Sequence, residues 1–305
     1  MRIVFAGTPE PALPSLRRLA ASRHEIVGVV TRRDAPLGRK RVLTPSPVAA
    51  LAAELGLPVL KTDRLDAAAT ETITSWSADL GVIVAYGGLV REPLLSAPRH
   101  GWINLHFSLL PAWRGAAPVQ HSLIAGDRIT GVSVFQLVPE LDAGDVFAQT
   151  RHPVDRGATA GDLLAGLADL GADTLSDVVD AIADGTAIAV PQTGEPTLAP
   201  KLTLADGLLD FALPADTVLD RFRGTTPEPG AHTTVVGQRL KVLAARRGPD
   251  ASLAPREIRL VGKEVLVGTA DGTISLLSVQ PAGRGAMPAP DWWRGQRADS
   301  VEAGS

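Results

Sequence analysis

The sequence predicts an α/β fold in two parts: a doubly wound, Rossmann-like parallel sheet domain at the N-terminus and a small, OB-like β-barrel domain at the C-terminus. Two observations predict the first part. Short apolar runs alternate with amphipathic stretches up to Gly185. Residues 79–88, DLGVIVAYGG, are almost wholly apolar, as in a strand buried on both faces. A third observation predicts the barrel, because short alternating segments with Gly-Lys and Asp-Gly turns follow beyond residue 206.

The first domain is expected to cover residues 1–188. Its first unit is an apolar run (2–6), a Gly-Thr-Pro turn, an amphipathic helix and a second apolar run (25–31). Repetition of this unit places consecutive strands in one sheet with the helices on its faces. The expected strands are 2–6, 25–31, 58–62, 79–88, 100–108, 129–138 and 145–154, and the expected helices are 14–22, 47–56, 119–126 and 161–185.

The C-terminal part begins with a segment rich in Pro and Gly at 189–206, which predicts a linker. Residues 207–305 then form the expected barrel, with strands in 232–247 and 257–283. The strand count alone does not distinguish an OB-like from an SH3-like barrel.

Composition excludes several classes of protein. The chain of 305 residues contains no Cys, so it has neither a disulfide framework nor a thiolate metal site. The apolar run before Gly7 is too short for a secretory signal or a membrane span, which predicts a cytoplasmic protein with no membrane partner. The Gly7-Thr8 turn lacks the third glycine of a dinucleotide fingerprint, so no nicotinamide cofactor is expected.

Polar side chains stand at the end of the strand expected at 100–108. Asn104 and His106 are two residues apart and therefore point the same way in an extended segment. Open parallel sheets bind ligands at the carboxyl ends of their strands. The following strand runs into a turn at 139–145 with three acids, and a carboxylate there has the chemistry to orient and charge-stabilise an imidazole. The amide, the imidazole and the carboxylate each also have a structural interpretation, as a turn former or a packed histidine.

The chain offers no nucleophile for a covalent intermediate, since it has neither Cys nor a G-x-S-x-G elbow. Direct transfer between two bound substrates is the simpler chemistry. No cluster has metal-ligand spacing, so no metal is predicted. The remaining histidines are interpreted as structural or solvated: His24, His100, His121, His152 and His232.

Charge is uneven although the net charge is only −3. The stretch 31–41, TRRDAPLGRKR, carries five bases and one acid. Such a run is either a solvated loop or a contact with a polyanion, and charge alone leaves both interpretations open.

The run Asn104-Leu105-His106-Phe107-Ser108-Leu109-Leu110-Pro111, followed by Leu141-Asp142-Ala143-Gly144-Asp145, resembles the folate-dependent formyltransferases. Within that family the finer resemblance is to the branch that formylates methionyl initiator tRNA. It rests on 113–118 (WRGAAP), 5–9 (FAGTP), 85–87 (AYG) and 276–283 (LLSVQPAG). The likeness covers essentially the whole chain.

The resemblance implies an enzyme that moves a formyl group from 10-formyltetrahydrofolate to the α-amino group of methionyl initiator tRNA, by direct attack through a tetrahedral intermediate. In this interpretation Asn104 and His106 donate hydrogen bonds to the oxyanion, and Asp142 holds the imidazole and helps to move the proton. The expected folate contacts are Ser108, Leu109, Leu110, Pro111, Tyr86, Gly87, Leu89 and Asp142. The expected tRNA contacts are Arg39, Lys40 and Arg41, together with the barrel, and the expected state is a monomer.

One segment departs from the family pattern. A Trp commonly precedes the Pro-x-Pro-Gly-Ala run in the family, whereas Thr226 stands there in this chain and Glu228 adds an acid between the prolines. Three alternatives remain: formyl transfer to a sugar-nucleotide amine, formyl transfer to glycinamide ribonucleotide, and a folate- or RNA-binding protein without catalysis. The second is disfavoured because such enzymes lack the second domain.

Overall fold

The computed structural model describes residues 1–38 and 40–304, which form two compact units. The first unit comprises Met1–Pro118, Ile129–Pro153 and Leu164–Ala199. The second comprises Val119–Arg128, Val154–Leu163 and the chain from Pro200 onward. Two short excursions of the earlier chain thus belong to the unit that holds the C-terminal part. The domain boundary at 188 and the linker at 189–206 stay predictions.

A seven-stranded sheet forms the middle of the first unit. Its strand order is β10 (Val146–Pro153), β9 (Ile129–Gln136), β7 (Trp102–His106), β6 (Leu80–Val84), β1 (Arg2–Gly7), β2 (Glu25–Thr31) and β5 (Val59–Lys61). The strands from β7 to β5 run parallel, while β9 is antiparallel to both of its neighbours. The α/β prediction is confirmed, and the sheet is mixed rather than wholly parallel. Chain order reverses between β1 and β6, which is where open α/β sheets bind ligands.

Of the helices before residue 190, α4 (Pro118–Ile124) falls almost wholly in the second unit. The others accompany this sheet: α1 (Leu13–Ala20), α2 (Pro47–Glu54), α3 (Ala67–Ser75) and most of α5 (Ala160–Ala183), with a short 3-10 turn at Glu10–Ala12. Side-chain caps start two of them. Ser46 Oγ accepts the Ala49 N–H of α2, and Asp66 accepts the Ala69 N–H of α3, both at 3.0 Å. The strands β1 and β6 are buried almost throughout, which explains why an unbroken apolar run predicted them.

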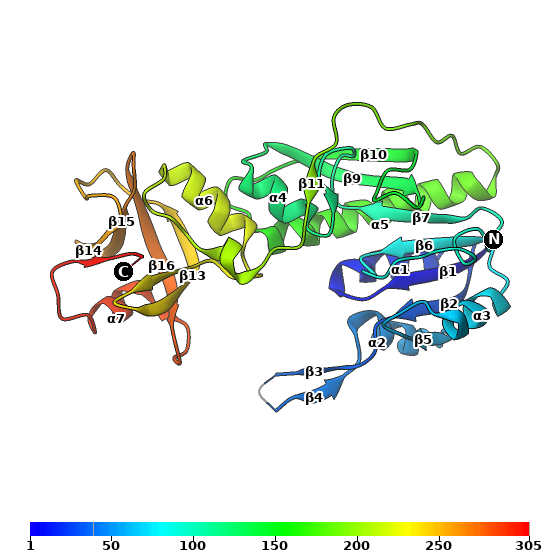
Figure 1. The fold of residues 1–305 in the computed structure, drawn as a ribbon, viewed down its shortest axis with the longest axis horizontal. Coiled ribbons are helices and arrows are strands. Elements are labelled where there is room, and N and C mark those ends of the chain that lie inside the picture. The colour runs from blue at the N-terminus through cyan, green and yellow to red at the C-terminus, as the bar shows by residue number, and fades with distance from the viewer. Residues whose placement is uncertain (39, 305) are drawn as a thin grey trace. The chain divides into compact units, whose positions relative to one another are not determined.

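Two small pairings lie outside the main sheet. The basic stretch, interpreted from sequence as a loop, carries an antiparallel hairpin of β3 (Ala35–Leu37) and β4 (Val42–Thr44), which projects beyond β2 and β5 (Figure 1). Sequence periodicity missed it because its strands are only three residues long and exposed. The other pairing is parallel, between β8 (Arg114–Gly115) and β11 (Leu198–Ala199).

The second unit contains the predicted barrel. Its strands follow the order β12 (His232–Val235), β13 (Gln238–Arg247), β16 (Thr273–Pro281), β15 (Glu264–Gly268), β14 (Glu257–Val261) and β18 (Val301–Glu302), and β17 (Met287–Pro288) pairs with β16. A bridge between Val235 and Ala303 nearly closes the sheet on itself. No sequence pattern predicted α6 (Ala215–Gly224), α7 (Ala289–Trp293) or the 3-10 turn Leu204–Gly207. Among the described helices of both units, none is long and apolar enough to cross a membrane.

Candidate active site

The carboxyl end of β7 presents Asn104 and His106 on one face of the strand. Asn104 lies opposite Ile83 of β6 and Phe135 of β9, and His106 lies opposite Ser133. The Asn104 side chain is partly buried and has no hydrogen-bond partner among the residues that the structure describes. A half-buried amide without a partner has its donors available to a ligand.

His106 is enclosed by acceptors. Its Nε2 lies 2.8 Å from the carbonyl oxygen of Trp113, and its Nδ1 lies 3.8 Å from Asp142 Oδ2. A carbonyl only accepts, so the first contact requires a proton on Nε2. Burial lowers the pKa of His106 more strongly than the Asp142 charge and the Trp113 carbonyl raise it. The ring is therefore neutral near pH 7, and its Nδ1 presents a lone pair on the side of the carboxylate.

Asp142 sits in a tight turn at the end of β9. Its backbone φ is 45°, in the left-handed region that non-glycine residues rarely occupy. Its Oδ2 accepts the Gly115 N–H at 2.8 Å, which aims the carboxylate toward the β7 end. Only glycine fits at 144, because a Cβ there would lie 1.8 Å from the Gln136 carbonyl oxygen. The structure thus places the Asp142 carboxylate beside His106, which is two residues along β7 from Asn104. The catalytic roles of the three residues stay a prediction.

The loop after β7 is braced by two residues that the sequence analysis missed. Ser133 Oγ donates to the Ser108 carbonyl at 2.6 Å and accepts the Leu110 N–H at 3.0 Å. Gln149 Nε2 donates to the Leu110 carbonyl at 2.8 Å. Ser108 and Leu110 are buried. A polar residue in the middle of the apolar run 129–138 was a signal for Ser133, whereas nothing in the sequence pointed to Gln149.

The turn after β6 holds the other expected folate residues in different ways. The Tyr86 side chain is buried in the core of the unit, so only its backbone is available to a ligand. Burial also raises the pKa of the Tyr86 hydroxyl. Gly87 has a φ of 73°, and its carbonyl accepts Arg32 Nη2 at 2.6 Å. Leu89 is exposed, as is Leu141 of the acidic turn.

A cavity of about 460 Å³ adjoins the acidic turn and is lined by Gln136, Val138, Glu140, Ala143, Gly144, Asp145 and Ala189. Its volume is in the range of pockets that take small ligands. Asn104 and His106 are not among its lining residues. Asp142 does not line it either, so the cavity adjoins the acidic turn without being lined by any of the three candidate catalytic residues.

Two of the three expected tRNA residues lie in the turn of the hairpin. Lys40 and Arg41 are exposed in the turn between β3 and β4, and Arg39 lies outside the described residues. Arg32, at the start of the basic stretch, is committed elsewhere. Besides its bond to Gly87, it stands 5.8 Å over the Tyr86 ring, so this charge supports the turn after β6.

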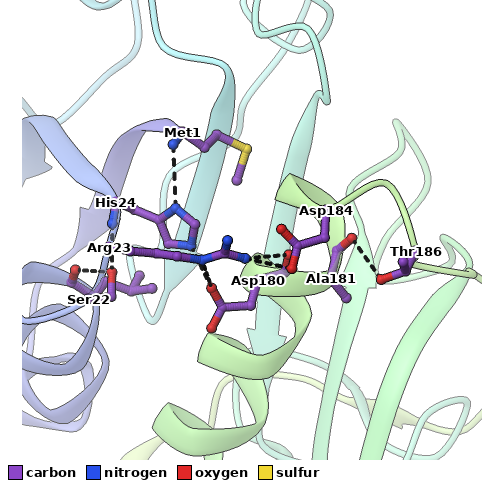
Figure 2. Close-up of polar contacts among 9 residues, drawn as sticks. Met1, Ser22, Arg23, His24, Asp180, Ala181, Asp184 and Thr186 are labelled. Atoms are coloured by element: carbon purple, nitrogen blue, oxygen red, sulfur yellow. Dashed lines mark hydrogen bonds and ion pairs between the residues drawn. The ribbon is translucent and has the colours of Figure 1, made fainter.

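A second His–Asp pair joins α5 to the start of β2 (Figure 2). His24 Nε2 lies 3.1 Å from Asp180 Oδ1, and the Met1 amine lies 3.5 Å from His24 Nδ1. Arg23 donates to Asp180 at 2.6 Å and to Asp184 at 2.7 Å. The Arg23 hydrogen bond is the main reason why the pKa of Asp180 is lowered. Within residues 1–38 and 40–304, no His, Asp and Glu side chains gather as a metal-ligand set.

Comparison with known proteins assigns both parts of the chain. The family model described as formyl transferase matches residues 1–179, and the one described as its C-terminal domain matches residues 201–297. Methionyl-tRNA formyltransferase of Clavibacter sepedonicus is 60% identical over 304 residues, which cover 99% of this chain and 100% of that protein.

Two solved structures share the fold at low sequence identity. An N-formyltransferase from Helicobacter canadensis, in a complex with folinic acid and dTDP-3-aminofucose, has a TM-score of 0.70 at 14% identity and covers 92% of this chain and 98% of its own. Methionyl-tRNA formyltransferase from Clostridium thermocellum has a TM-score of 0.59 at 14% identity, with 81% and 94% covered.

Proposed function

The chain belongs to the formyl transferase family, and on that premise we propose that it transfers the formyl group of 10-formyltetrahydrofolate to the α-amino group of methionyl initiator tRNA. The observation that carries the site is the unpartnered Asn104 amide beside the His106–Asp142 pair at the carboxyl end of β7. The near-complete match to a methionyl-tRNA formyltransferase supports the acceptor.

In this proposal the reaction is one direct displacement. The neutral amine of the methionyl group attacks the formyl carbon, whose carbonyl electrons move to oxygen and leave an oxyanion and an ammonium on one tetrahedral centre. Collapse of that centre re-forms the carbonyl and breaks the bond to N10 of the folate. N10 takes up a proton, and the products are formylmethionyl-tRNA and tetrahydrofolate.

Asn104 and His106 would stabilise the oxyanion. The Asn104 amide donates without giving up a bond, because no other described residue takes up its donors. The Nε2–H of His106 would leave the Trp113 carbonyl for the oxyanion as charge develops there. Each such donor contributes about 10²–10³ in rate.

Asp142 would take part in the proton transfer together with His106. The proton lost by the ammonium passes, through water, to the basic groups that face each other across 3.8 Å, namely His106 Nδ1 and the Asp142 carboxylate. An imidazolium formed there would be stabilised by the carboxylate beside it. The same pair can return the proton to N10 as the leaving group departs.

The folate would lie along the backbone of three segments: 108–111, the turn after β6 and the acidic turn. The cavity of about 460 Å³ beside the acidic turn has room for part of a folate. The complex of the Helicobacter enzyme with folinic acid supports a folate as the formyl donor. The exposed Leu89 and Leu141 would cover apolar parts of the ligand.

The acceptor tRNA would contact Lys40 and Arg41 in the turn of the β3–β4 hairpin, Arg39, and the basic residues of the barrel. Each phosphate contact that is lost lowers the slope of log K against log salt by about 0.9. Arg39→Lys keeps the charge but loses planar, bidentate contacts, so we expect it to reduce discrimination between initiator and elongator tRNA. The ratio of kcat/KM for the two charged tRNAs at one salt concentration measures this, and an unchanged ratio would remove Arg39 from recognition.

The experiment that tests the function is formylation of charged initiator tRNA, with charged elongator methionyl-tRNA as its matched control. We expect rapid transfer to the first and slow transfer to the second. Formyl transfer to a sugar-nucleotide amine is less supported, because the relative that acts on such a substrate shares 14% identity whereas the tRNA enzyme shares 60%. Transfer to an aminosugar nucleotide but not to the tRNA would reverse that assignment.

A further inference from the structure

The segment 190–199, here called the strap, is hydrogen-bonded at several points to segments of the candidate site. At its start, Val190 and Val146 exchange two backbone hydrogen bonds of 2.8 and 3.0 Å. Near its end, the backbone N–H of Trp113 donates to Thr197 Oγ1 at 2.8 Å. Ala199 then accepts the Ala117 N–H at 3.1 Å. The strap is therefore hydrogen-bonded both to the end of the acidic turn, at Val146, and to the loop after β7, at Trp113 and Ala117.

Gln192, between these anchors, uses its whole hydrogen-bonding capacity. Its Nε2 donates to the carbonyls of Asp142 and Gly144, at 2.8 and 2.9 Å. Its Oε1 accepts Nε and Nη2 of Arg114, at 3.2 and 2.6 Å. An amide side chain has two donors and two lone pairs, and all four are engaged. A partly buried side chain so fully matched holds its partners in one geometry.

The Asp142 turn needs such support. Its left-handed backbone is unfavourable for a non-glycine residue and persists only where the surroundings over-determine it. The strap contacts Asp142 directly at its backbone and, through Gly115, at its side chain. Gln192 holds the Asp142 carbonyl, while Gly115, whose N–H holds the carboxylate, packs so closely on the strap that a Cβ would lie 2.7 Å from the Ala199 carbonyl oxygen.

We propose that Gln192 is a positioning residue for formyl transfer, which keeps the Asp142 carboxylate facing His106 by clamping the acidic turn to Arg114. The inference rests on the proposed function. Gln192 touches neither substrate in this account and acts through Asp142. Through the Gln192 side chain, the strap does more than connect the first unit to the barrel.

The test removes the clamp in two ways. Gln192→Ala deletes all four bonds, and Gln192→Glu keeps acceptors for Arg114 but loses the donors to the turn. Displacing a reacting group by about 1 Å costs up to about 10²-fold in rate, so we expect both variants to lose about ten- to a hundred-fold in kcat, with KM for both substrates within about three-fold of wild type. Thr193→Ala is the matched control, since Thr193 is adjacent and exposed and should keep wild-type kcat.

A titration of the His106 ring by NMR separates positioning from general loosening. Asp142 raises the pKa of His106, so a displaced carboxylate should lower that pKa further in both Gln192 variants. Wild-type kcat in Gln192→Ala and Gln192→Glu would overturn the proposal. So would a lost kcat with an unchanged His106 titration. Wild-type enzyme that fails to formylate initiator tRNA would instead refute the proposed function.

Discussion

The first unit contains two His–Asp pairs, and the distance within each pair does not indicate which one is suited to catalysis. His24 and Asp180 are 3.1 Å apart, with 2% and 42% of their side chains exposed, whereas His106 and Asp142 are 3.8 Å apart, with 6% and 12% exposed. The closer pair is the structural one. Its ring has a donor on one side, the Met1 amine, and an acceptor on the other, Asp180, so a neutral imidazole satisfies both.

His106 faces acceptors on both sides, the Trp113 carbonyl and the Asp142 carboxylate, and a neutral ring has one proton for the two. Burial nevertheless holds the ring neutral. Arg23 neutralises Asp180, whereas no arginine among the described residues forms an ion pair with Asp142. Under the proposed function, the comparison teaches that the pair assigned to catalysis is distinguished by an imbalance of donors and acceptors in a closed environment, and not by a short contact.

The largest expected effect comes from removing each histidine. His106→Ala deletes an oxyanion donor and should lower kcat about 10²–10³-fold while the protein stays folded. His24→Ala should keep kcat within about two-fold below its melting temperature and lower that temperature, because it leaves polar groups without partners. Saturating turnover and thermal unfolding measure the two effects. If His106→Ala keeps a tenth or more of wild-type turnover, His106 is not an oxyanion donor and both histidines are structural.

The carboxylates should separate in the same way. Asp142→Asn keeps the shape of the turn and removes the charge beside His106, so we expect kcat to fall about 10²-fold with folate affinity within a few-fold. Asp180→Asn should leave kcat unchanged. Equilibrium folate binding and single-turnover rates distinguish the cases. If folate affinity collapses while the bound complex reacts normally, Asp142 belongs to the binding surface.

A smaller effect is expected on the titration of His106. Since burial depresses its pKa, the ring should titrate below about 6.5, the value of an exposed histidine. Asp142→Asn removes a charge that raises this pKa, so the midpoint should move to still lower pH. Asp180→Asn, as control, should leave the His106 midpoint in place. A His106 midpoint above that of an exposed histidine would show that the carboxylate outweighs burial.

The smallest effect concerns acid stability. The pKa of Asp180 is lower in the folded chain than in the unfolded one, chiefly through the Arg23 hydrogen bond. Its contribution is therefore complete above the unfolded pKa of about 3.9 and is lost as the pH falls through the folded value. Because the pair is exposed, Asp180→Asn should lower the melting temperature by only about 1–3 °C at pH 7. That difference should vanish near the acid limit, and a constant difference would contradict the linkage.

Patterns set by nearby residues could be predicted from the sequence. The alternation of apolar strands and amphipathic helices predicted the α/β sheet, and the short segments near the C-terminus predicted the barrel. Both could be predicted because the residues on the buried face of a helix or strand recur with the period of that element. The spacing of Asn104 and His106 placed both on one face of β7. The resemblance to a known family then supplied Asp142, whose distance from His106 no local pattern could predict.

The sequence by itself thus determined the classes of structure and the residue types of the site, and only the tertiary structure decided which partners they meet. Arg32 looked like one more base of a charged stretch, but it supports the turn at Gly87. Gln192 carried no signal in its Pro- and Gly-rich surroundings, yet it joins Asp142 to Arg114 across 50 and 78 positions of chain. Period and propensity report only a residue's own neighbourhood, whereas hydrogen bonds between distant segments exist only once the sheet has brought those segments together.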